Sequence, residues 1–325
     1  MSVKRLSTPR VDKLLKSIYE NVKHPDSFSS PFRLYQAAKK INSRIKIKHV
    51  REWLEGHRTY TLHRKVVTRF PRRKVLVRGP NHQYQADLMD YQAIARENDG
   101  FHYLLTVIDC FSRFATIIPI KNKTGPAVRD GLKKAFDFMG FPKKMQTDEG
   151  KEFYNHVVKY FFDQKKNIHF STFQEVKDSI CARFNRTVRD KLKKYFTHKK
   201  TLRYLDILPD VIFSYNNKPH STLGRLYAPS EVNEKNRQAV FDLMYGDYLR
   251  ERKKNHKFFP GDKVRVSAYR ETFRQRDKKN FSEEIFTVAE CLDTKPPTYL
   301  LLDPEDEKVI QGAYYENQLQ RWRPQ

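Results

Sequence analysis

Two aspartates in strand-like surroundings carry the clearest chemical signal in this sequence. Asp87 follows Tyr84-Gln85-Ala86 in the middle of one predicted strand, and Asp148 follows Gln146-Thr147 at the end of another. A carboxylate that points from a central strand into a medium of low dielectric constant is unfavourable unless it pairs or binds a cation. Two such carboxylates repel each other when they are brought together, and a hard divalent ion removes that conflict.

This pair predicts a site for Mg²⁺ or Mn²⁺ that acts on phosphodiesters. Adjacent strands can place both carboxylates within reach of one or two metal ions, and two metals can activate the attacking oxygen and stabilise the leaving oxygen. The alternative for either residue taken alone is a surface acid or a helix cap. Two more acids are candidates: strand alternation puts Asp90 on the face opposite to Asp87, and we interpret Asp109, just before a predicted turn, as structural.

The elements that must position these acids form a predicted α/β domain over residues 82–235. Three apolar, β-branched strands come first, in YQADLMDYQAI, HYLLTVIDCF and RFATIIPI, with a tight turn at Ser112–Arg113 between the last two. A helix over Thr124–Met139, a short strand KKMQTD, a helix over Glu152–Lys165 and a long basic helix over Lys177–Lys194 follow. Three antiparallel strands, a helix, a strand and further helices are the order of a ribonuclease-H-like fold.

Four runs of this domain resemble the catalytic core of retroviral-type integrases. They are Tyr-Gln-Ala-Asp at 84–87, Val-Ile-Asp-x-Phe-Ser-Arg-Phe at 107–114, Thr-Asp-Glu-Gly-x-Glu-Phe at 147–153 and Arg-Phe-Asn-Arg-Thr at 183–187. Flanking segments are similar to the integrases of Polinton/Maverick transposons. These include Thr-Tyr-Thr-Leu-His at 59–63, Ser-Tyr-Asn-Asn at 214–217 and the ending Tyr-Tyr-Glu-Asn-Gln-Leu-Gln at 314–320. The resemblance covers nearly the whole chain.

The resemblance implies a catalytic triad of Asp, Asp and Glu, and this chain departs from it at the third member. Carried over, the first two are Asp87 and Asp148, whereas the third position is Ala182, just before Arg-Phe-Asn-Arg-Thr. Alanine cannot bind a metal, so we expect the second metal site to be lost and the chain to be inactive. Because alanine is an excellent helix former, the fold should survive. A deliberate inactivating substitution and a naturally decayed or domesticated copy both explain this alanine.

Basic residues on the same predicted helix are expected to meet DNA. Arg186 and Arg189 follow Ala182 by four and seven positions and share its helical face. Lys177 and Ser179, at the entry to this helix, should lie near the scissile phosphate. Asp178 lies one turn before Ala182 on the same face, and about 5.4 Å of rise per turn makes it too distant to replace the missing glutamate.

The N-terminal segment, residues 1–62, is predicted to be a helical, helix-turn-helix-like DNA-binding module. Short apolar sets at helical spacing are separated by polar turns, and a plain helical hairpin used for packing is the alternative. Its histidines lack nearby cysteines, so we expect no zinc. Residues 63–81 form a basic linker, which we interpret as an extended arm on DNA phosphates. Its central cations are Arg72, Arg73 and Lys74.

The C-terminal part divides into a basic helical linker, residues 236–258, and a predicted small β-barrel, residues 259–325. Short strands at close spacing with turn signals favour such a barrel, and the resemblance implies an SH3-like or chromodomain-like one. Arg265 and nearby basic residues suggest a DNA contact. Contact with chromatin is left open, and the aromatic residues present do not define a cage for a histone tail. Tyr269, Phe273 and Trp322 fit a barrel core equally well.

Composition supports a nucleic-acid partner. The formal net charge is +26 at pH 7 over 325 residues, and nucleic acid is the commonest polyanion bound by so basic a protein. A solvated basic surface, an acidic protein partner and a membrane are the alternatives. No apolar run approaches the roughly 20 residues of a spanning helix, the first residues have no signal-peptide pattern, and three scattered cysteines fit a reducing compartment.

The sequence therefore predicts a DNA integrase or transposase that acts on double-stranded DNA as a homo-oligomer, a dimer or tetramer. The active form would bind transposon terminal repeats, process their 3′ ends and join them to target DNA by Mg²⁺- or Mn²⁺-dependent transesterification. No nucleotide-binding GxxxxGK[ST] loop is present. The family resemblance implies action in the nucleus. Two rivals stay open: a domesticated, non-catalytic DNA-binding regulator and a ribonuclease-H-like nuclease.

Overall fold

The computed structural model describes residues 9–171, 180–251, 255–267 and 279–324. The chain folds as two compact units. The central unit is residues 75–251, and the terminal unit combines residues 1–74 with residues 252–325. The two ends of the chain, which the sequence divides into separate modules, therefore belong to one unit. No helix in the described part of the chain is long and apolar enough to cross a membrane.

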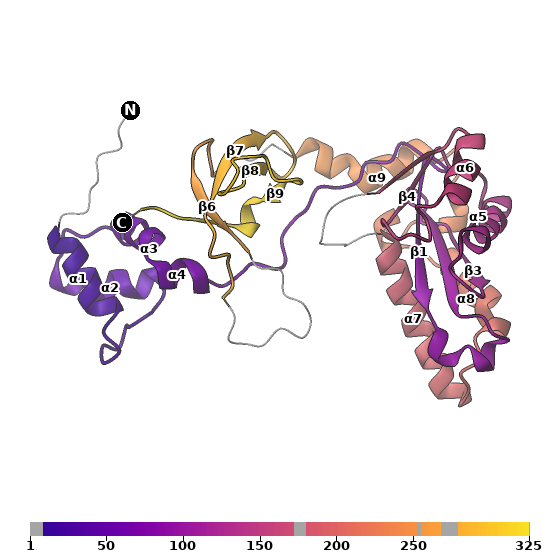
Figure 1. Cartoon of the computed structure of the whole chain (residues 1–325), viewed down its shortest axis with the longest axis horizontal. Coiled ribbons are helices and arrows are strands. Elements are labelled where there is room, and N and C mark those ends of the chain that lie inside the picture. The colour runs from indigo at the N-terminus through magenta and orange to yellow at the C-terminus, as the bar shows by residue number, and fades with distance from the viewer. Residues whose placement is uncertain (1–8, 172–179, 252–254, 268–278, 325) are drawn as a thin grey trace. The chain divides into compact units, whose positions relative to one another are not determined.

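The central unit is built on a five-stranded mixed sheet with the order β3-β2-β1-β4-β5 (Figure 1). The first three strands pair antiparallel, and β4 and β5 continue the sheet in parallel from β1. The strands are β1 (Gln83–Asp90), β2 (Tyr103–Asp109), β3 (Ala115–Ile120), β4 (Lys144–Thr147) and β5 (Ile168–Ser171). Four of the five were predicted. Strand β5 was missed because four residues are too short a run to distinguish a strand from the preceding helix and loop.

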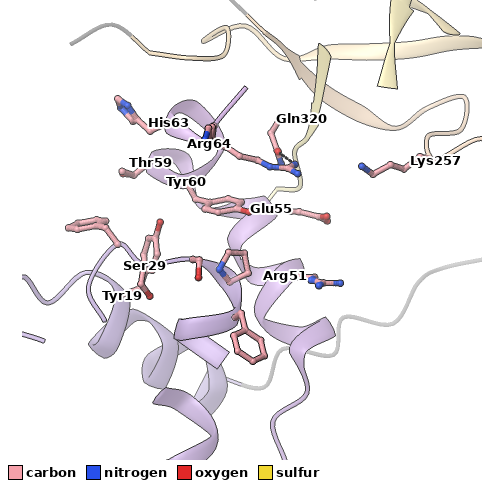
Figure 2. A pocket seen from close by; sticks show the side chains of 15 residues that line it. Tyr19, Ser29, Arg51, Glu55, Thr59, Tyr60, His63, Arg64, Lys257 and Gln320 are labelled. Atoms are coloured by element: carbon pink, nitrogen blue, oxygen red, sulfur yellow. Dashed lines mark hydrogen bonds between the residues drawn. The ribbon is translucent and has the colours of Figure 1, made fainter. Parts of the chain in front are cut away.

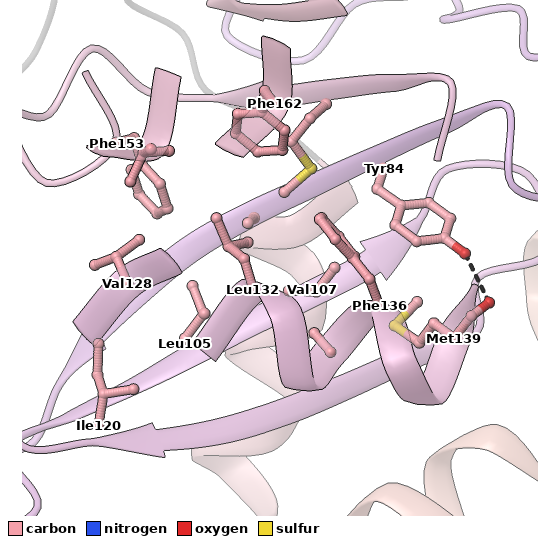
Figure 3. Close-up of a cluster of buried hydrophobic side chains, with 14 residues drawn as sticks. Tyr84, Leu105, Val107, Ile120, Val128, Leu132, Phe136, Met139, Phe153 and Phe162 are labelled. Atoms are coloured by element: carbon pink, nitrogen blue, oxygen red, sulfur yellow. Dashed lines mark hydrogen bonds between the residues drawn. The ribbon is translucent and has the colours of Figure 1, made fainter. Parts of the chain in front are cut away.

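Helices cover both faces of this sheet because successive side chains of a strand point to opposite sides. On one face, Leu105 and Val107 of β2 pack with Leu132 and Phe136 of α5 (Gly125–Met139). Helix α6 (His156–Gln164) adds to this cluster (Figure 3). On the other face, Leu104 and Ile108 of the same strand pack with α7 (Ile180–Lys199) and α8 (Leu208–Asn216).

Two helix boundaries differ from the prediction. Helix α6 begins at His156 rather than Glu152 because the Asn155 side chain caps it, accepting the N–H groups of Val157 and Val158 at 3.1 Å. Helix α7 is described from Ile180 and continues to Lys199, past the predicted end at Lys194. Residues 172–179, which include Lys177, Asp178 and Ser179, lie outside the described residues.

Helix α9 (Arg237–Arg250), predicted as part of a linker, packs into the central unit. Val240, Met244 and Tyr245 are buried in one cluster with Val77 and Phe111. The Tyr245 hydroxyl accepts the backbone N–H of Val77 at 3.4 Å. Apolar burial therefore moves both boundaries of the predicted 82–235 domain outward, to residues that were assigned to flanking linkers.

Four helices form the N-terminal part of the terminal unit: α1 (Pro9–Tyr19), α2 (Pro31–Ile41), α3 (Ile47–Gly56) and α4 (Arg58–His63). Their buried contacts are made by the periodic apolar residues that predicted the first three, among them Leu15, Ile18, Leu34, Val50 and Leu54. Residues 64–82 that follow contain no helix or strand.

The C-terminal strands form a second antiparallel sheet with the order β10-β6-β7-β8-β9. Among the described residues this sheet is open, so the predicted closed barrel is not observed. The two outer strands are only two and three residues long, which leaves few backbone groups for closure. The strands are β6 (Lys263–Val266), β7 (Phe286–Leu292), β8 (Thr298–Leu302), β9 (Tyr314–Tyr315) and β10 (Leu319–Arg321).

Candidate active site

Asp87 and Asp148 lie on the same face of the central sheet. In the parallel pairing of β1 and β4, Gln85 is opposite Gln146, and their side chains share a hydrogen bond of 3.0 Å. Asp87 lies two residues after Gln85 within β1, so strand alternation puts it on the glutamine side. Asp148 is the first residue after β4 and lies two residues after Gln146. Both carboxylates act on the Cys181 thiol. Burial raises the pKa of this thiol, and the negative charges of Asp87 and Asp148 raise it further.

The Asp87 carboxylate is half-buried and held in place by two donors. Its Oδ1 accepts the N–H of Leu88 at 2.8 Å, and its Oδ2 accepts the side-chain amide of Asn185 at 2.9 Å. The Thr106 hydroxyl of the neighbouring strand donates to the backbone carbonyl of Asp87 at 3.0 Å. Together these contacts orient the carboxylate toward the first turns of α7.

Asp148 is held through both its side chain and its backbone, and its Oδ1 accepts the N–H of Gly150 at 3.3 Å. The Thr147 hydroxyl donates to the Asp148 carbonyl at 2.8 Å and contacts Nε2 of His169 at 2.9 Å. Burial lowers the pKa of His169 to about 4, so the ring is neutral at neutral pH. Because the single Thr147 proton is used on the carbonyl, His169 must donate from Nε2. Sequence reasoning missed this histidine because it lies on the unpredicted strand β5.

The start of α7 is fixed against this face of the sheet. The N–H of Cys181 donates to Oε1 of Gln85 at 3.0 Å, and Asn185 reaches Asp87 one turn later. Ala182 precedes Asn185 by three positions and therefore shares its helical face. A longer acidic side chain at position 182 would start from the helix face that already contacts Asp87. Asn185 was inside a motif noted in the sequence, but its contact with Asp87 was not predicted.

The donor set suits a divalent cation but is short of one ligand. Mg²⁺ takes oxygen ligands, keeps several waters and is commonly bound by one or two carboxylates, which Asp87 and Asp148 provide. In the described part of the chain, no group of three His, Cys, Asp or Glu residues is arranged to hold a metal ion. Ala182, on the face of α7 that carries Asn185, contributes no carboxylate to this set.

The two other candidate acids lie away from this set. Both carboxylate oxygens of Asp90 bind Gln92, through its N–H at 2.9 Å and its side-chain amide at 2.8 Å. Asp109 is 2% exposed and accepts hydrogen bonds from Ser112 and from the N–H of Phe111. Burial raises the pKa of Asp109, and these hydrogen bonds oppose that shift. Its contacts hold the turn between β2 and β3, which fits the structural role predicted for it.

The residues expected to meet DNA have different surroundings. Arg186 and Arg189 are exposed on α7, whereas Lys177 lies outside the described residues. In the linker, Arg73 and Lys74 are exposed. Arg72 is half-buried, with its guanidinium 5.2 Å from the ring centre of Phe70.

Arg265 differs from the expectation, because its side chain is used inside the terminal unit. It is 4% exposed, and its guanidinium donates to the Thr61 hydroxyl of α4 at 3.2 Å and to the carbonyls of Ser282 and Glu283. A backbone hydrogen bond also joins α4 to the C-terminal segment: the N–H of Asn280 donates to the Leu62 carbonyl at 2.8 Å. The Arg265 guanidinium therefore joins the two ends of the chain through hydrogen bonds to protein acceptors. Little of its surface remains exposed for a contact with DNA.

Replacing Arg265 with alanine should destabilise the terminal unit by about 2–3 kcal/mol, because buried carbonyls lose a charged donor. Lys263→Ala, on the same strand but exposed, should change stability by less than about 0.5 kcal/mol. Thermal and denaturant unfolding of the two variants checks this. Unchanged stability of Arg265→Ala together with weakened DNA binding would instead establish Arg265 as a DNA contact.

His220 should make the stability of the central unit depend on pH. Burial, with Arg113 and Arg183 nearby, lowers its pKa from 6.5 to about 4, and Nδ1 accepts the N–H of Thr222 at 3.1 Å. The unfolded state therefore binds more protons than the folded state between these two values, so stability falls as pH decreases through that window.

His220→Asn should reduce this pH dependence, because asparagine keeps an acceptor for Thr222 but does not titrate. We expect the loss of unfolding free energy between pH 7 and pH 5 to be smaller by about 1 kcal/mol in the variant, allowing for solvent screening. Urea unfolding at both pH values measures it. An identical loss in both proteins would show that His220 does not carry the effect.

Comparison with known proteins places this site in a family. The model of the integrase core domain matches residues 77–208. An uncharacterized transposon-derived protein of Caenorhabditis elegans is 30% identical over 218 residues, which cover 67% of this chain and 71% of that protein. The retrovirus-related Pol polyprotein from transposon 297 of Drosophila melanogaster is 25% identical over 130 residues, 39% of this chain and 12% of the polyprotein.

A solved structure also shares the fold. It is the cryo-electron microscopy structure of the simian T-cell lymphotropic virus intasome in complex with the PP2A regulatory subunit B56 gamma. The likeness covers 90% of this chain and 99% of that chain, with a TM-score of 0.59 and 15% sequence identity. At this identity the likeness concerns the fold alone.

Proposed function

The chain belongs to the integrase core family of the retroviral-type superfamily, and we propose that its ancestral activity is the joining of transposon DNA ends to target DNA. The observation that carries this proposal is the convergence of α7 on the two aspartates. Asn185 of α7 contacts Asp87, and Ala182 lies on the same face of the helix. The third carboxylate of the family pattern belongs at this point.

The residues of the site have separable roles in this proposal. Asp87 and Asp148 would hold a divalent cation, which when bound lowers the pKa of an attacking water or 3′-hydroxyl and neutralises charge on the phosphate. Asn185 and Leu88 orient Asp87, and the chain from His169 through Thr147 orients Asp148. The exposed Arg186 and Arg189 on α7 would hold the DNA end beside this pair. The chain as it stands is inactive because Ala182 cannot contribute the third ligand.

The finer identity is a Polinton/Maverick integrase that acts in the nucleus as a dimer or tetramer. The similarity of the flanking motifs to that group supports it, and the net charge of +26 supports a double-stranded DNA partner. The exposed cations of the linker, Arg73 and Lys74, would bind the backbone of the same DNA. In this proposal the C-terminal sheet would contact chromatin.

A joining assay tests this function. The chain and its Ala182→Glu variant are incubated with Mg²⁺ or Mn²⁺, duplex oligonucleotides carrying the transposon terminal repeat and a target plasmid. We expect joined products from the variant alone. Absence of joining by both proteins, with specific binding of the terminal repeat retained by both, would overturn the catalytic proposal.

A second function has one observation in its favour. Position 182, where the family resemblance implies a carboxylate, is alanine, while the neighbouring contacts of Cys181 and Asn185 are present. A domesticated copy that retained DNA binding and lost catalysis would have this combination. It predicts alanine at position 182 in the natural locus, so sequencing that locus distinguishes a regulator from an altered enzyme.

A further inference from the structure

A cavity of about 850 Å³ opens in the terminal unit (Figure 2), whereas the aspartate pair belongs to the central unit. Its walls come from both ends of the chain: α1, the loop before α2, α3 and α4 on one side, and Lys257 and Gln320 on the other. Figure 2 shows Arg64, the residue after α4, bonded to Gln320 of β10. The volume is in the range of sites that enclose a small ligand or one unit of a polymer.

Aromatic rings form much of the wall. Phe28 and Phe32 line the cavity and are 50% and 60% exposed, although rings of this size are usually covered. Phe28 has a φ of 46°, an unfavourable backbone conformation for a bulky side chain, and its ring meets that of Tyr19 edge-on at 5.3 Å. Strained backbone conformations of this kind persist where the surrounding structure fixes the position of the side chain.

The phenols of the cavity remain donors at neutral pH. Burial raises the pKa of Tyr19 to about 12, with Tyr60 adding to the shift. Burial also raises the pKa of Tyr60, against the opposing charges of Arg64 and Arg51. The Ser29 hydroxyl is buried at the wall and has no hydrogen-bond partner among the described residues. Buried hydroxyls are usually satisfied, so Ser29 is an unsatisfied polar group in the wall of the cavity.

The charge of the cavity is strongly positive. Four cations line it, Arg51, Arg64, Lys65 and Lys257, of which Lys257 pairs with Glu316 at 3.3 Å, and Glu55 is the one carboxylate among the lining residues. Glu55 is already paired with Arg323 at 2.7 Å. Arg51 and Lys65 are exposed and form no ion pair with any residue that the structure describes. An anionic ligand would therefore find unneutralised cations beside accessible rings.

We propose that this cavity binds an unpaired nucleotide of a DNA strand, with its base against the exposed rings and its phosphate at Arg51 and Lys65. Proteins bind single strands with aromatic side chains that stack on the bases and with nearby cations that bind the phosphates. Duplex DNA is bound through its phosphates by exposed basic surfaces, which need no cavity for a base. An acidic peptide would use the cations but not the phenylalanine rings. The inference rests on the proposed function, since removal of nucleotides from a 3′ end leaves the partner strand unpaired.

Fluorescence anisotropy of the full chain with labelled oligothymidylate of eight nucleotides tests the proposal, with a blunt duplex of equal length as the competitor. Phe32→Ala and Arg51→Glu should each weaken single-strand binding at least about fivefold. Two matched controls should stay within about twofold: Phe138→Ala, an equally exposed ring of the central unit, and Lys13→Glu, an exposed terminal-unit cation outside the cavity. Unchanged melting temperatures verify that each variant is folded.

Photocrosslinking with one 5-iododeoxyuridine in the oligonucleotide gives a second readout, and we expect adducts on Phe28, Phe32 or Tyr60. Equal weakening by Arg51→Glu and Lys13→Glu, or no effect of Phe32→Ala, would overturn the proposal in favour of diffuse charge. Competition by oligoglutamate as strong as by oligothymidylate would overturn it in favour of an acidic peptide. Joining by the Ala182→Glu chain without single-strand binding would refute this inference and leave the proposed function standing.

Discussion

Ala182→Glu should raise metal-dependent joining of transposon ends by about three orders of magnitude over the chain as it stands. The new carboxylate would start from the face of α7 on which Asn185 already contacts Asp87 at 2.9 Å, so little rearrangement is needed. One lost metal ligand accounts for several kcal/mol of transition-state stabilisation, and about 4 kcal/mol corresponds to a thousandfold change in rate. Quantifying joined products with time, in Mg²⁺ and in Mn²⁺, measures the gain.

Ala182→Gln is the matched control, because glutamine has nearly the same shape as glutamate and no charge. We expect it to bind the DNA ends as well as the glutamate variant does and to join none. If the glutamine variant joined DNA as fast as the glutamate variant, shape rather than metal binding would explain the gain. If neither joined DNA, position 182 would not be the missing ligand.

In the Ala182→Glu background, Asp87→Asn should lower joining about a thousandfold or more. The substitution retains the size of the side chain and removes the charge that a divalent cation requires, while Thr106 still holds the strand through the backbone at 3.0 Å. Asp148→Asn should have an effect of the same order. Joining rates at saturating DNA, together with unchanged affinity for the DNA ends, separate this effect from loss of binding.

Asp90→Asn is the control for charge on the same strand. Asp90 is exposed and bonded to Gln92, on the face of β1 opposite to Asp87. We expect joining within about twofold of the parent. A loss as large as that of Asp87→Asn would mean that net charge, and not the aspartate pair, limits the reaction.

Most of the central site could be predicted because local pattern and topology agree there. Apolar β-branched runs indicated β1, β2 and β3, and the pairing of β4 with β1 brings Gln146 opposite Gln85, each two residues before one of the aspartates. The helical position of Ala182 followed from a motif with known spacing. What could not be predicted was the support of the site, because Asn185, Thr147 and His169 act through contacts between elements that are distant in sequence.

The terminal unit was predicted least well, for a physical reason. Local patterns give the helices α1 to α3 and the strands β6 to β8, but they carry no information on which surfaces pack together. The junction of α4 with the C-terminal strands depends on backbone carbonyls of Leu62, Ser282 and Glu283, whose partners are not encoded in any periodicity. For the same reason Arg265 was taken for a DNA contact: a basic residue has the same pattern whether its acceptor is a phosphate or a carbonyl.

The most direct test of the account is the location of Mn²⁺ in crystals of the Ala182→Glu chain, measured by anomalous scattering. The account predicts a peak bound by carboxylate oxygens of both Asp87 and Asp148. Anomalous density that contacts only one of the two aspartates, or that is found elsewhere on the chain at saturating Mn²⁺, would contradict it.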